Sequence, residues 1–485
     1  MEETEIALIK GKIVNGVLAL TSRTFILQII TLVSTFLLGI LLTSQEFGIY
    51  WVVLAVISFL SYFSDIGLAA ALIQKKTTPE RNDLVTAFTV QQLLAGSIFV
   101  MMLIIAPMLS AYYQIGNSGL FLLRALTFSF LLASLKTIPS VLLERKLEFK
   151  LLIIPQILET GVFYLTTIIL ATLGFGVASF AWGAIVRAVV GLVAIFIVSP
   201  WRIGIGISWG SLKELLSFGT PFQANSLLAL IKDDLMTIFL GKILPFSEVG
   251  YLGWAKKWSE VHLRLIMDSV IRVTFPTFSR LQEDKKILAK ALSKSLFFLS
   301  YFIFPTTGLL ILCVKPLIYI VPRYIKWEPA LNSFYLFTFS SMLAAFSSPM
   351  VNALNALGKI KISLLLMIMW TVLTWALILP LISIFGFQGV AISLFIISFT
   401  SVFPVILMRK YVYFPVLTSI YKPFLSTLII FLPLYLIINS LLSIFGIVIS
   451  VMTMTLLYLS ITYLWMREEV SPYLPKFIRD KWLKG

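Results

Sequence analysis

Long apolar runs, each close to or above 20 residues, dominate the chain and are separated by short polar turns. About 20 helical residues cross a bilayer core, whereas barrel strands would alternate in segments of about 10. Backbone groups in lipid need partners within their own element, so the pattern predicts an all-α bundle. We expect fourteen spans, at roughly 14–42, 47–73, 84–111, 118–142, 151–173, 177–199, 214–241, 249–277, 293–315, 330–356, 362–384, 389–408, 420–440 and 444–466.

Composition agrees with a polytopic membrane protein. Of the 485 residues 59% are hydrophobic and only 12% charged, half of the quarter or so that is usual in soluble proteins. The net charge is +16, but most Lys and Arg lie in short turns between spans, which disfavours nucleic acid as a partner. A single cysteine, Cys313, excludes an internal disulfide, and a single histidine disfavours a metal site. We expect no metal and no cofactor.

Lys and Arg are distributed unevenly over the two sides of the predicted bundle. Twenty-five lie in segments on one side, and four lie on the other, namely Lys242, Lys315, Arg323 and Lys326. Because cytoplasmic loops are enriched in Lys and Arg, the richer side is predicted to be cytoplasmic, and both termini with it. One helix too many or too few before the last spans would place later loops on the wrong side and destroy this asymmetry. The asymmetry therefore also supports the count through the twelfth span.

Two stretches of the chain match at an offset of 202 residues. Residues 39–50 and 241–252 share Gly, Glu and Gly around the turns that join spans 1 and 2 and spans 7 and 8, and a fainter match pairs 174–178 with 387–391. Two matches in the same order favour two six-helix lobes related by a pseudo-two-fold axis along the membrane normal. In such transporters the substrate site lies between the lobes near the midplane. Small residues that recur at helix turns by chance are the alternative explanation.

This repeat sets the expected domain organisation. An N-terminal lobe spans 1–200, a C-terminal lobe spans 201–412, and two additional membrane helices occupy 413–466. Residues 467–485 form a basic cytoplasmic tail in which aromatic residues alternate with Lys and Arg, as in interfacial segments.

The stretch from Leu230 to Thr274 is apolar enough to enter a bilayer yet carries twelve Asp, Glu, Lys, Arg and His residues. Five of them recur every fourth residue and would form one stripe on a helix: Lys256, Glu260, Arg264, Asp268 and Arg272. A charge at membrane depth costs about 2.5–3.5 kcal/mol on insertion scales, so it usually faces a bundle interior or a wet cavity. We interpret the stripe as the lining of a solvated, net-cationic cavity. The alternative is a set of i,i+4 salt bridges that only stiffen the helix.

Four short motifs stand out in the first lobe: FGIY at 47–50, DIG at 65–67, ALIQ at 71–74 and DLVTAF at 83–88. Together they resemble the N-terminal lobe of polysaccharide flippases, the O-antigen and exopolysaccharide repeat-unit exporters of the multidrug/oligosaccharidyl-lipid/polysaccharide superfamily. The second lobe resembles the family in its arrangement of helices more than in its sequence motifs.

The resemblance implies alternating access through a cationic cavity between the lobes, lined by helices 1, 2, 7 and 8. The substrate would be an undecaprenyl-diphosphate-linked oligosaccharide, moved from the cytoplasmic to the periplasmic leaflet of a bacterial inner membrane. The two helices beyond the twelfth resemble those of lipid II flippases and some exporters, and a groove for the polyprenyl tail is expected there. Candidate partners are the lipid bilayer, a polysaccharide polymerase and a chain-length regulator, with a monomer as the expected state.

A diphosphate needs several donors and positive charge, which Arg supplies in bidentate geometry and Lys as a point charge. The candidate substrate-binding residues are Arg23, Lys232, Lys256, Lys257, Arg264 and Arg272. Buried carboxylates can titrate with a conformational change and couple transport to an H+ or Na+ gradient. The candidates for that role, or for simple charge balance, are Asp65, Asp233, Asp234, Glu260 and Asp268. Six cations against five acids leave a surplus of one positive charge.

Other polar and aromatic residues allow two interpretations each. Trp254 can stack on a sugar or anchor a membrane interface. His262 can relay protons or act as one more polar cavity residue. Lys136 is expected to snorkel to the headgroups, whereas Glu159 and Arg187 are expected to form an ion pair within the first lobe.

No phosphate-binding glycine loop, nucleophile elbow or metal-ligand pair occurs, so the sequence predicts a carrier rather than an enzyme. The alternatives that stay open are a membrane polysaccharide polymerase or ligase, a lipid II flippase and a multidrug antiporter. A polymerase typically needs large periplasmic loops, which this chain lacks. A drug-cation site would be net acidic.

Overall fold

The computed structural model describes the backbone of residues 2–438 and 443–471. The side chains of residues 2–21, 220–222, 224–226, 265, 268, 269, 272, 273, 275, 276 and 438 lie outside the described set. Within these ranges every regular element is a helix. Twelve stretches are long and apolar enough to cross a membrane. The all-helical, polytopic fold predicted from the sequence is therefore confirmed.

The predicted count of fourteen spans stays a prediction. The two predicted spans that are absent from the twelve are 214–241 and 249–277, which correspond to helix α9 (Trp209–Ile243) and to α10 (Phe246–Ser259) with α11 (Val261–Arg280). These helices carry the charged stretch, and charge lowers their mean hydropathy. Helix α9 has 35 residues, whereas the second of these spans is divided into α10 with 14 residues and α11 with 20.

The chain divides into two compact units, Met1–Gly253 and Trp254–Gly485. The division falls within α10, so α9 belongs to the first unit, where it packs against α2, α3 and α4. The lobe boundary predicted at residue 200 follows from the sequence repeat, whereas the two compact units are defined by contacts between residues. The two lobes and their symmetry stay predictions. The other helices of unit 1 are α1 (Glu2–Leu41), α2 (Ser44–Asp65), α3 (Leu68–Gln74), α4 (Arg81–Tyr113), α5 (Gly116–Ser134), α6 (Thr137–Arg145), α7 (Phe149–Thr172) and α8 (Val177–Val198).

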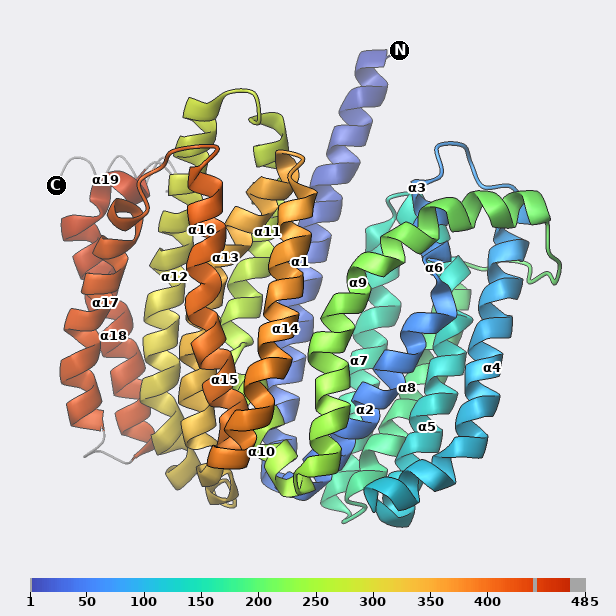
Figure 1. The fold of residues 1–485 in the computed structure, drawn as a ribbon, viewed down its shortest axis with the longest axis horizontal. Coiled ribbons are helices and arrows are strands. Elements are labelled where there is room, and N and C mark those ends of the chain that lie inside the picture. The colour runs from blue at the N-terminus through green and yellow to red at the C-terminus, as the bar shows by residue number, and fades with distance from the viewer. Residues whose placement is uncertain (1, 439–442, 472–485) are drawn as a thin grey trace. The chain divides into compact units, whose positions relative to one another are not determined.

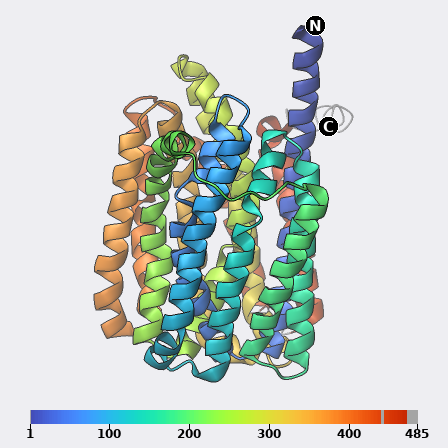
Figure 2. The same ribbon diagram turned by 90° about the vertical axis from the view of Figure 1, so that its right-hand side faces the viewer.

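The long helices of unit 1 run side by side, and α9 curves strongly along its length (Figures 1 and 2). Helix α2 starts at a capping box, because Thr43 Oγ1 accepts from the Glu46 amide at 3.3 Å and Glu46 accepts from the Thr43 amide at 2.7 Å. Helix α2 ends at Asp65, where Ile66 and Gly67 adopt left-handed backbone angles. Gly67 also touches Gly219 of α9, since a Cβ there would lie 2.2 Å from the Gly219 carbonyl oxygen.

A polar cluster holds the end of α3 and the turn that follows it. The Arg145 guanidinium of α6 donates hydrogen bonds of 2.6 to 3.0 Å to four carbonyls in residues 72–77, which satisfies the free end of α3. Lys75 lies 2.8 Å from Glu214 and 2.9 Å from Asp83. These hydrogen bonds raise the pKa of Lys75, so its ammonium stays charged. Asp83, from one of the sequence motifs, thus has a structural partner.

Unit 2 is built around α12 (Lys285–Ile320). Its buried stripe of Leu288, Leu292 and Leu296 packs against Met350 and Leu354 of α13. The remaining elements are α13 (Leu331–Ala356), α14 (Ile360–Phe385), α15 (Gln388–Ser398), α16 (Val402–Arg409), α17 (Leu417–Ile438), α18 (Ile444–Trp465), α19 (Arg467–Val470) and the 3-10 turns η1 (Ile325–Ala330) and η2 (Phe399–Ser401).

The two helices predicted beyond the twelfth span are α17 and α18, and both pack on α12. Tyr458 of α18 donates a hydrogen bond of 2.9 Å to the carbonyl of Tyr301. Lys422 pairs with Glu469 at 2.5 Å and so ties α17 to α19. The predicted tail is described only as far as residue 471, and its other residues lie outside the described set.

The matched turns of the sequence repeat lie against each other within unit 1. A Cβ on Gly48 of α2 would lie 1.8 Å from the carbonyl oxygen of Phe246, and a Cβ on Gly250 of α10 would lie 1.9 Å from that of Ser44. Ser44 and Phe246 are themselves 202 residues apart, as are Gly48 and Gly250. The two contacts therefore exchange under the repeat, which is the relation that a local two-fold axis produces.

A third contact lies where such an axis would pass. A Cβ on Gly253 would lie 2.5 Å from a ring carbon of Trp51, and these two residues are also 202 apart. A residue that touches its own counterpart must lie close to the axis. The glycines of the repeat thus permit a backbone-to-backbone crossing of α2 and α10.

We predict that Gly48→Ala and Gly250→Ala each destabilise the protein. The new methyl group must displace backbone, and overpacking of this kind costs about 1–3 kcal/mol. Thermal unfolding of the purified protein in detergent should show a lower melting temperature. Gly96→Ala in α4 is the matched control, because its Cβ meets nothing within 4 Å. Equal melting temperatures for the three variants would contradict the close crossing.

Candidate functional site

Three neighbouring charged residues of α9, Lys232, Asp233 and Asp234, have partners within unit 1. Lys232 Nζ lies 3.6 Å from the Asp233 carboxylate, and these side chains are 30% and 50% exposed. Asp234 accepts a hydrogen bond of 2.8 Å from the Ser58 hydroxyl of α2. Lys232 thus pairs with the acid next to it in the chain, and Asp234 links α9 to α2.

The predicted charge stripe continues across the break between α10 and α11. The amide of Glu260 donates to the Lys256 carbonyl at 3.1 Å, and the amide of Arg264 donates to the Glu260 carbonyl at 3.0 Å. Helical register is thus preserved through Glu260, which keeps these side chains on one face. The last two members of the stripe, Asp268 and Arg272, belong to α11, but their side chains lie outside the described residues.

Glu260 lies close to two cations. Its carboxylate is 2.9 Å from the Arg264 guanidinium, with side-chain exposures of 23% and 57%. Lys257 interacts electrostatically with both Arg264 and Glu260. This cluster of Lys257, Glu260 and Arg264 combines two positive charges with one negative charge. An i,i+4 ion pair is therefore present in the stripe, although it joins Glu260 to Arg264. A local positive surplus remains beside it.

Arg23 of α1 has a partner that the sequence did not indicate. It interacts electrostatically with Glu144 of α6, whose pKa is raised by burial and lowered by the Arg23 charge. Nothing in the spacing of α1 and α6 residues predicts this contact, because it depends on how the helices pack. With Glu144 included, the candidate set has six cations and six acids, so its net charge is zero. A positive surplus can then exist only in part of the set.

Asp65 has a structural contact at the start of α3. Its carboxylate accepts a hydrogen bond of 3.2 Å from the amide of Ala69. A carboxylate at a helix N-terminus satisfies one of the free amides there. The assignments of the eleven candidate residues to substrate binding or ion coupling stay predictions.

The aromatic and histidine interpretations are revised. Trp254 is 3% exposed and stacks on Trp327 at a centroid distance of 5.4 Å, and its indole N–H donates to the Tyr324 hydroxyl at 3.3 Å. It packs inside unit 2, so it is neither a sugar platform nor an interface anchor. His262 is 4% exposed and lies 3.2 Å from the Thr307 hydroxyl, so it is a packed core residue.

A second cluster of charges lies inside unit 1. Glu159 of α7 pairs with Lys136 at 2.6 Å and with Arg187 of α8 at 3.8 Å. The Glu159–Arg187 pair predicted from the sequence is confirmed. The expectation that Lys136 snorkels is wrong, because α5 ends just before Lys136 and its side chain, only 16% exposed, turns to Glu159 instead. Gly191 leaves room for the carboxylate, since a Cβ there would lie 2.1 Å from Oε1.

We predict that Glu159→Gln lowers the melting temperature strongly, because it leaves two cations without their counter-charge. Removal of one partner of a buried pair typically costs about 3–5 kcal/mol. Adding Lys136→Met to Glu159→Gln should restore part of the loss, and Glu283→Gln, at an exposed position, should have no effect. A Glu159→Gln protein as stable as the parent would show that the cluster contributes no stability.

The comparison with protein families finds a match over residues 37–332 to a family described as polysaccharide biosynthesis protein. Among curated relatives, the lipopolysaccharide biosynthesis protein WzxC of Escherichia coli is 23% identical over 443 residues, which are 88% of this chain and 86% of that protein. The succinoglycan biosynthesis transport protein ExoT of Rhizobium meliloti is 23% identical over 263 residues, which are 53% of this chain and 52% of that protein. The match thus spans about half of the length of the second relative.

Solved structures of the same fold include two classes of transporter. The lipid II flippase MurJ in an inward closed conformation gives a TM-score of 0.76 at 17% identity, covering 93% of this chain and 99% of that one. An inward-facing multidrug transporter of the MATE family gives 0.62 at 15% identity, covering 81% and 98%. At these identities the likeness concerns the fold.

Proposed function

The chain belongs to the polysaccharide biosynthesis protein family, and from this premise we propose that it is a flippase for lipid-linked oligosaccharides rather than an enzyme. The proposed substrate is an undecaprenyl-diphosphate-linked repeat unit. The proposed movement, by alternating access, runs from the cytoplasmic to the periplasmic leaflet of a bacterial inner membrane. The family match, the names of the relatives and the flippase-like fold all support a carrier.

The observation that carries the proposal furthest is the cluster of Lys257, Glu260 and Arg264. Two cations beside one carboxylate where α10 meets α11 retain a positive surplus, which an anionic ligand can neutralise. A diphosphate fits this surplus, because its oxygens accept hydrogen bonds from both Lys and Arg. Arg23, Lys232, Lys256 and Arg272 complete the proposed binding set.

Ion coupling is proposed for the acids of the same helices. Asp65, Asp233, Asp234, Glu260 and Asp268 would exchange H+ or Na+ as the cations bind and release substrate. Glu260 pairs with Arg264 at 2.9 Å. An anion bound to Arg264 competes with that carboxylate for the guanidinium, which links substrate binding to the ion pair of Glu260.

A second candidate function is a membrane polysaccharide polymerase. Purified protein mixed with lipid-linked repeat units distinguishes the two. Unchanged substrate is expected of a carrier, and polymeric product would identify an enzyme. A lipid II flippase is separated from the proposed function by genetic rescue, because only the matching substrate pathway is restored.

The sharpest test compares Arg264→Gln with Glu260→Gln, since both substitutions break the same ion pair. If the pair is only structural, both variants behave alike, with a small cost of about 1 kcal/mol or less. If the cluster binds the diphosphate, Arg264→Gln and Lys257→Gln weaken binding about 10- to 100-fold. Glu260→Gln then binds as tightly as the parent or more tightly.

Binding of an undecaprenyl-diphosphate-linked oligosaccharide is measured by native mass spectrometry, and movement across the bilayer by lectin accessibility in proteoliposomes. Lys315→Gln is the control for loss of a single positive charge elsewhere. Equal affinities for the Arg264→Gln and Glu260→Gln proteins would overturn the binding role of the cluster.

A further inference from the structure

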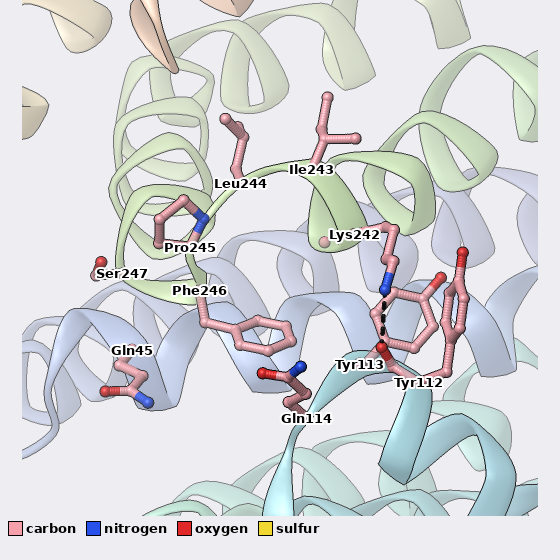
Figure 3. Close-up of a pocket in the computed structure, with 11 residues that line it drawn as sticks. Gln45, Tyr112, Tyr113, Gln114, Lys242, Ile243, Leu244, Pro245, Phe246 and Ser247 are labelled. Carbon is pink, nitrogen blue, oxygen red and sulfur yellow. Dashed lines mark hydrogen bonds between the residues drawn. The ribbon is translucent and has the colours of Figure 1, made fainter.

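A polar pocket of about 490 Å³ lies within unit 1, where the turn between α9 and α10 meets the start of α2 and the end of α4 (Figure 3). This volume falls in the range of about 300–1,000 Å³ that is typical of small-molecule sites. Its polar side chains come from all three segments: Gln45, Tyr112, Tyr113, Gln114, Lys242 and Ser247. None of them belongs to the charged cluster of the proposed transport site.

The walls of the pocket are tied together by two hydrogen bonds. The Lys242 ammonium donates to the Tyr112 carbonyl at 3.0 Å and lies 3.8 Å from the centroid of the Tyr112 ring. The Tyr113 hydroxyl donates to the Ile238 carbonyl of α9 at 3.2 Å. These contacts hold the end of α4 against the end of α9, so the pocket is formed before any ligand binds.

Gln114 is in an uncommon backbone conformation. Its φ is 55° and its ψ 39°, in the left-handed region, where it follows the last turn of α4. Glycine is the least strained residue at such a position. The chain keeps a carboxamide there instead, and residues held in this region cluster at ligand sites. In the view of Figure 3 the Gln45 carboxamide lies to one side of Gln114 and the Lys242 ammonium to the other.

The chemistry of the lining matches a sugar better than a phosphate. Carboxamides and hydroxyls offer donors and acceptors together, as the hydroxyls of a sugar ring require, whereas a phosphate only accepts. Tyrosine rings supply apolar faces for the C–H side of the ring. Among the described residues that line the pocket, Lys242 carries the only charge, and it makes no described ion pair. A carboxylate on the sugar would form an ion pair with this ammonium.

We propose that this pocket is a binding subsite for an acidic sugar, such as a uronic acid, of the carried oligosaccharide. The carried oligosaccharide rests on the proposed function, and Lys242 is on the side that the Lys and Arg distribution predicts to be periplasmic. The pocket would receive the glycan on the side where the substrate leaves the protein. Lys242 binds the carboxylate, and Gln45 and Gln114 bind the ring hydroxyls.

The test uses the purified full-length protein and two soluble probes that differ by one carboxylate, cellobiouronic acid and cellobiose. Saturation-transfer NMR titrations give the two dissociation constants. We expect the acidic probe to bind about tenfold more tightly, the value of one charge-assisted hydrogen bond. Lys242→Gln should abolish that difference. Gln114→Gly should weaken the binding of both probes. It should not lower the melting temperature, because glycine adopts the left-handed backbone conformation without strain.

Lys315→Gln is the matched control and should bind both probes like the parent. Equal affinities for the parent, Lys242→Gln and Gln114→Gly proteins would overturn the proposal. So would Lys242-dependent binding of glycerol 3-phosphate without binding of either disaccharide, which would identify a lipid-headgroup site.

The readout also separates this inference from the proposed function. Lys242-dependent binding of the acidic probe supports the subsite even if proteoliposomes move no lipid-linked oligosaccharide. Normal movement of lipid-linked oligosaccharide with no probe binding in NMR would overturn the subsite alone.

Discussion

A charged side chain inside a bilayer needs an opposite charge or water, and this requirement shapes the helices of this protein. Glu159 forms ion pairs with two cations, Asp233 pairs with Lys232, and Glu260 pairs with Arg264. Partners of this kind reduce the cost of burying charge without removing it. In the cluster of Lys257, Glu260 and Arg264 two cations share one acid, which is why the proposed anion site lies there.

The close crossing of α2 and α10 depends on a different constraint, the absence of side chains. Two helices approach at backbone distance only where glycine leaves room, and Gly48 and Gly250 each face a carbonyl of the other helix. The reciprocal form of these contacts follows from the repeat, because a segment and its counterpart meet around one axis. Small residues commonly mediate helix contacts in membranes for the same reason.

The glycine crossing and the polar pocket share one turn. Phe246 contributes its carbonyl to the contact with Gly48, and its side chain lines the pocket beside Gln114. Any movement of α2 against α10 therefore changes the shape of the pocket. Lys242 and Tyr113 hold α4 to the same turn, so three helices meet where the proposed sugar subsite lies.

The sequence by itself determined the helical class, the repeat at the turns and the positions of the charges, because hydropathy and spacing are local properties. It also predicted the Glu159–Arg187 pair from two charges of opposite sign within neighbouring predicted spans. The tertiary structure decided which residues meet: Lys136 with Glu159, Arg23 with Glu144, and Trp254 with Trp327. The six polar side chains around the pocket come from three segments that are far apart in sequence, at residues 45, 112–114 and 242–247. Only packing brings them together, since contacts between distant segments depend on how helices bend and cross, which no local pattern encodes.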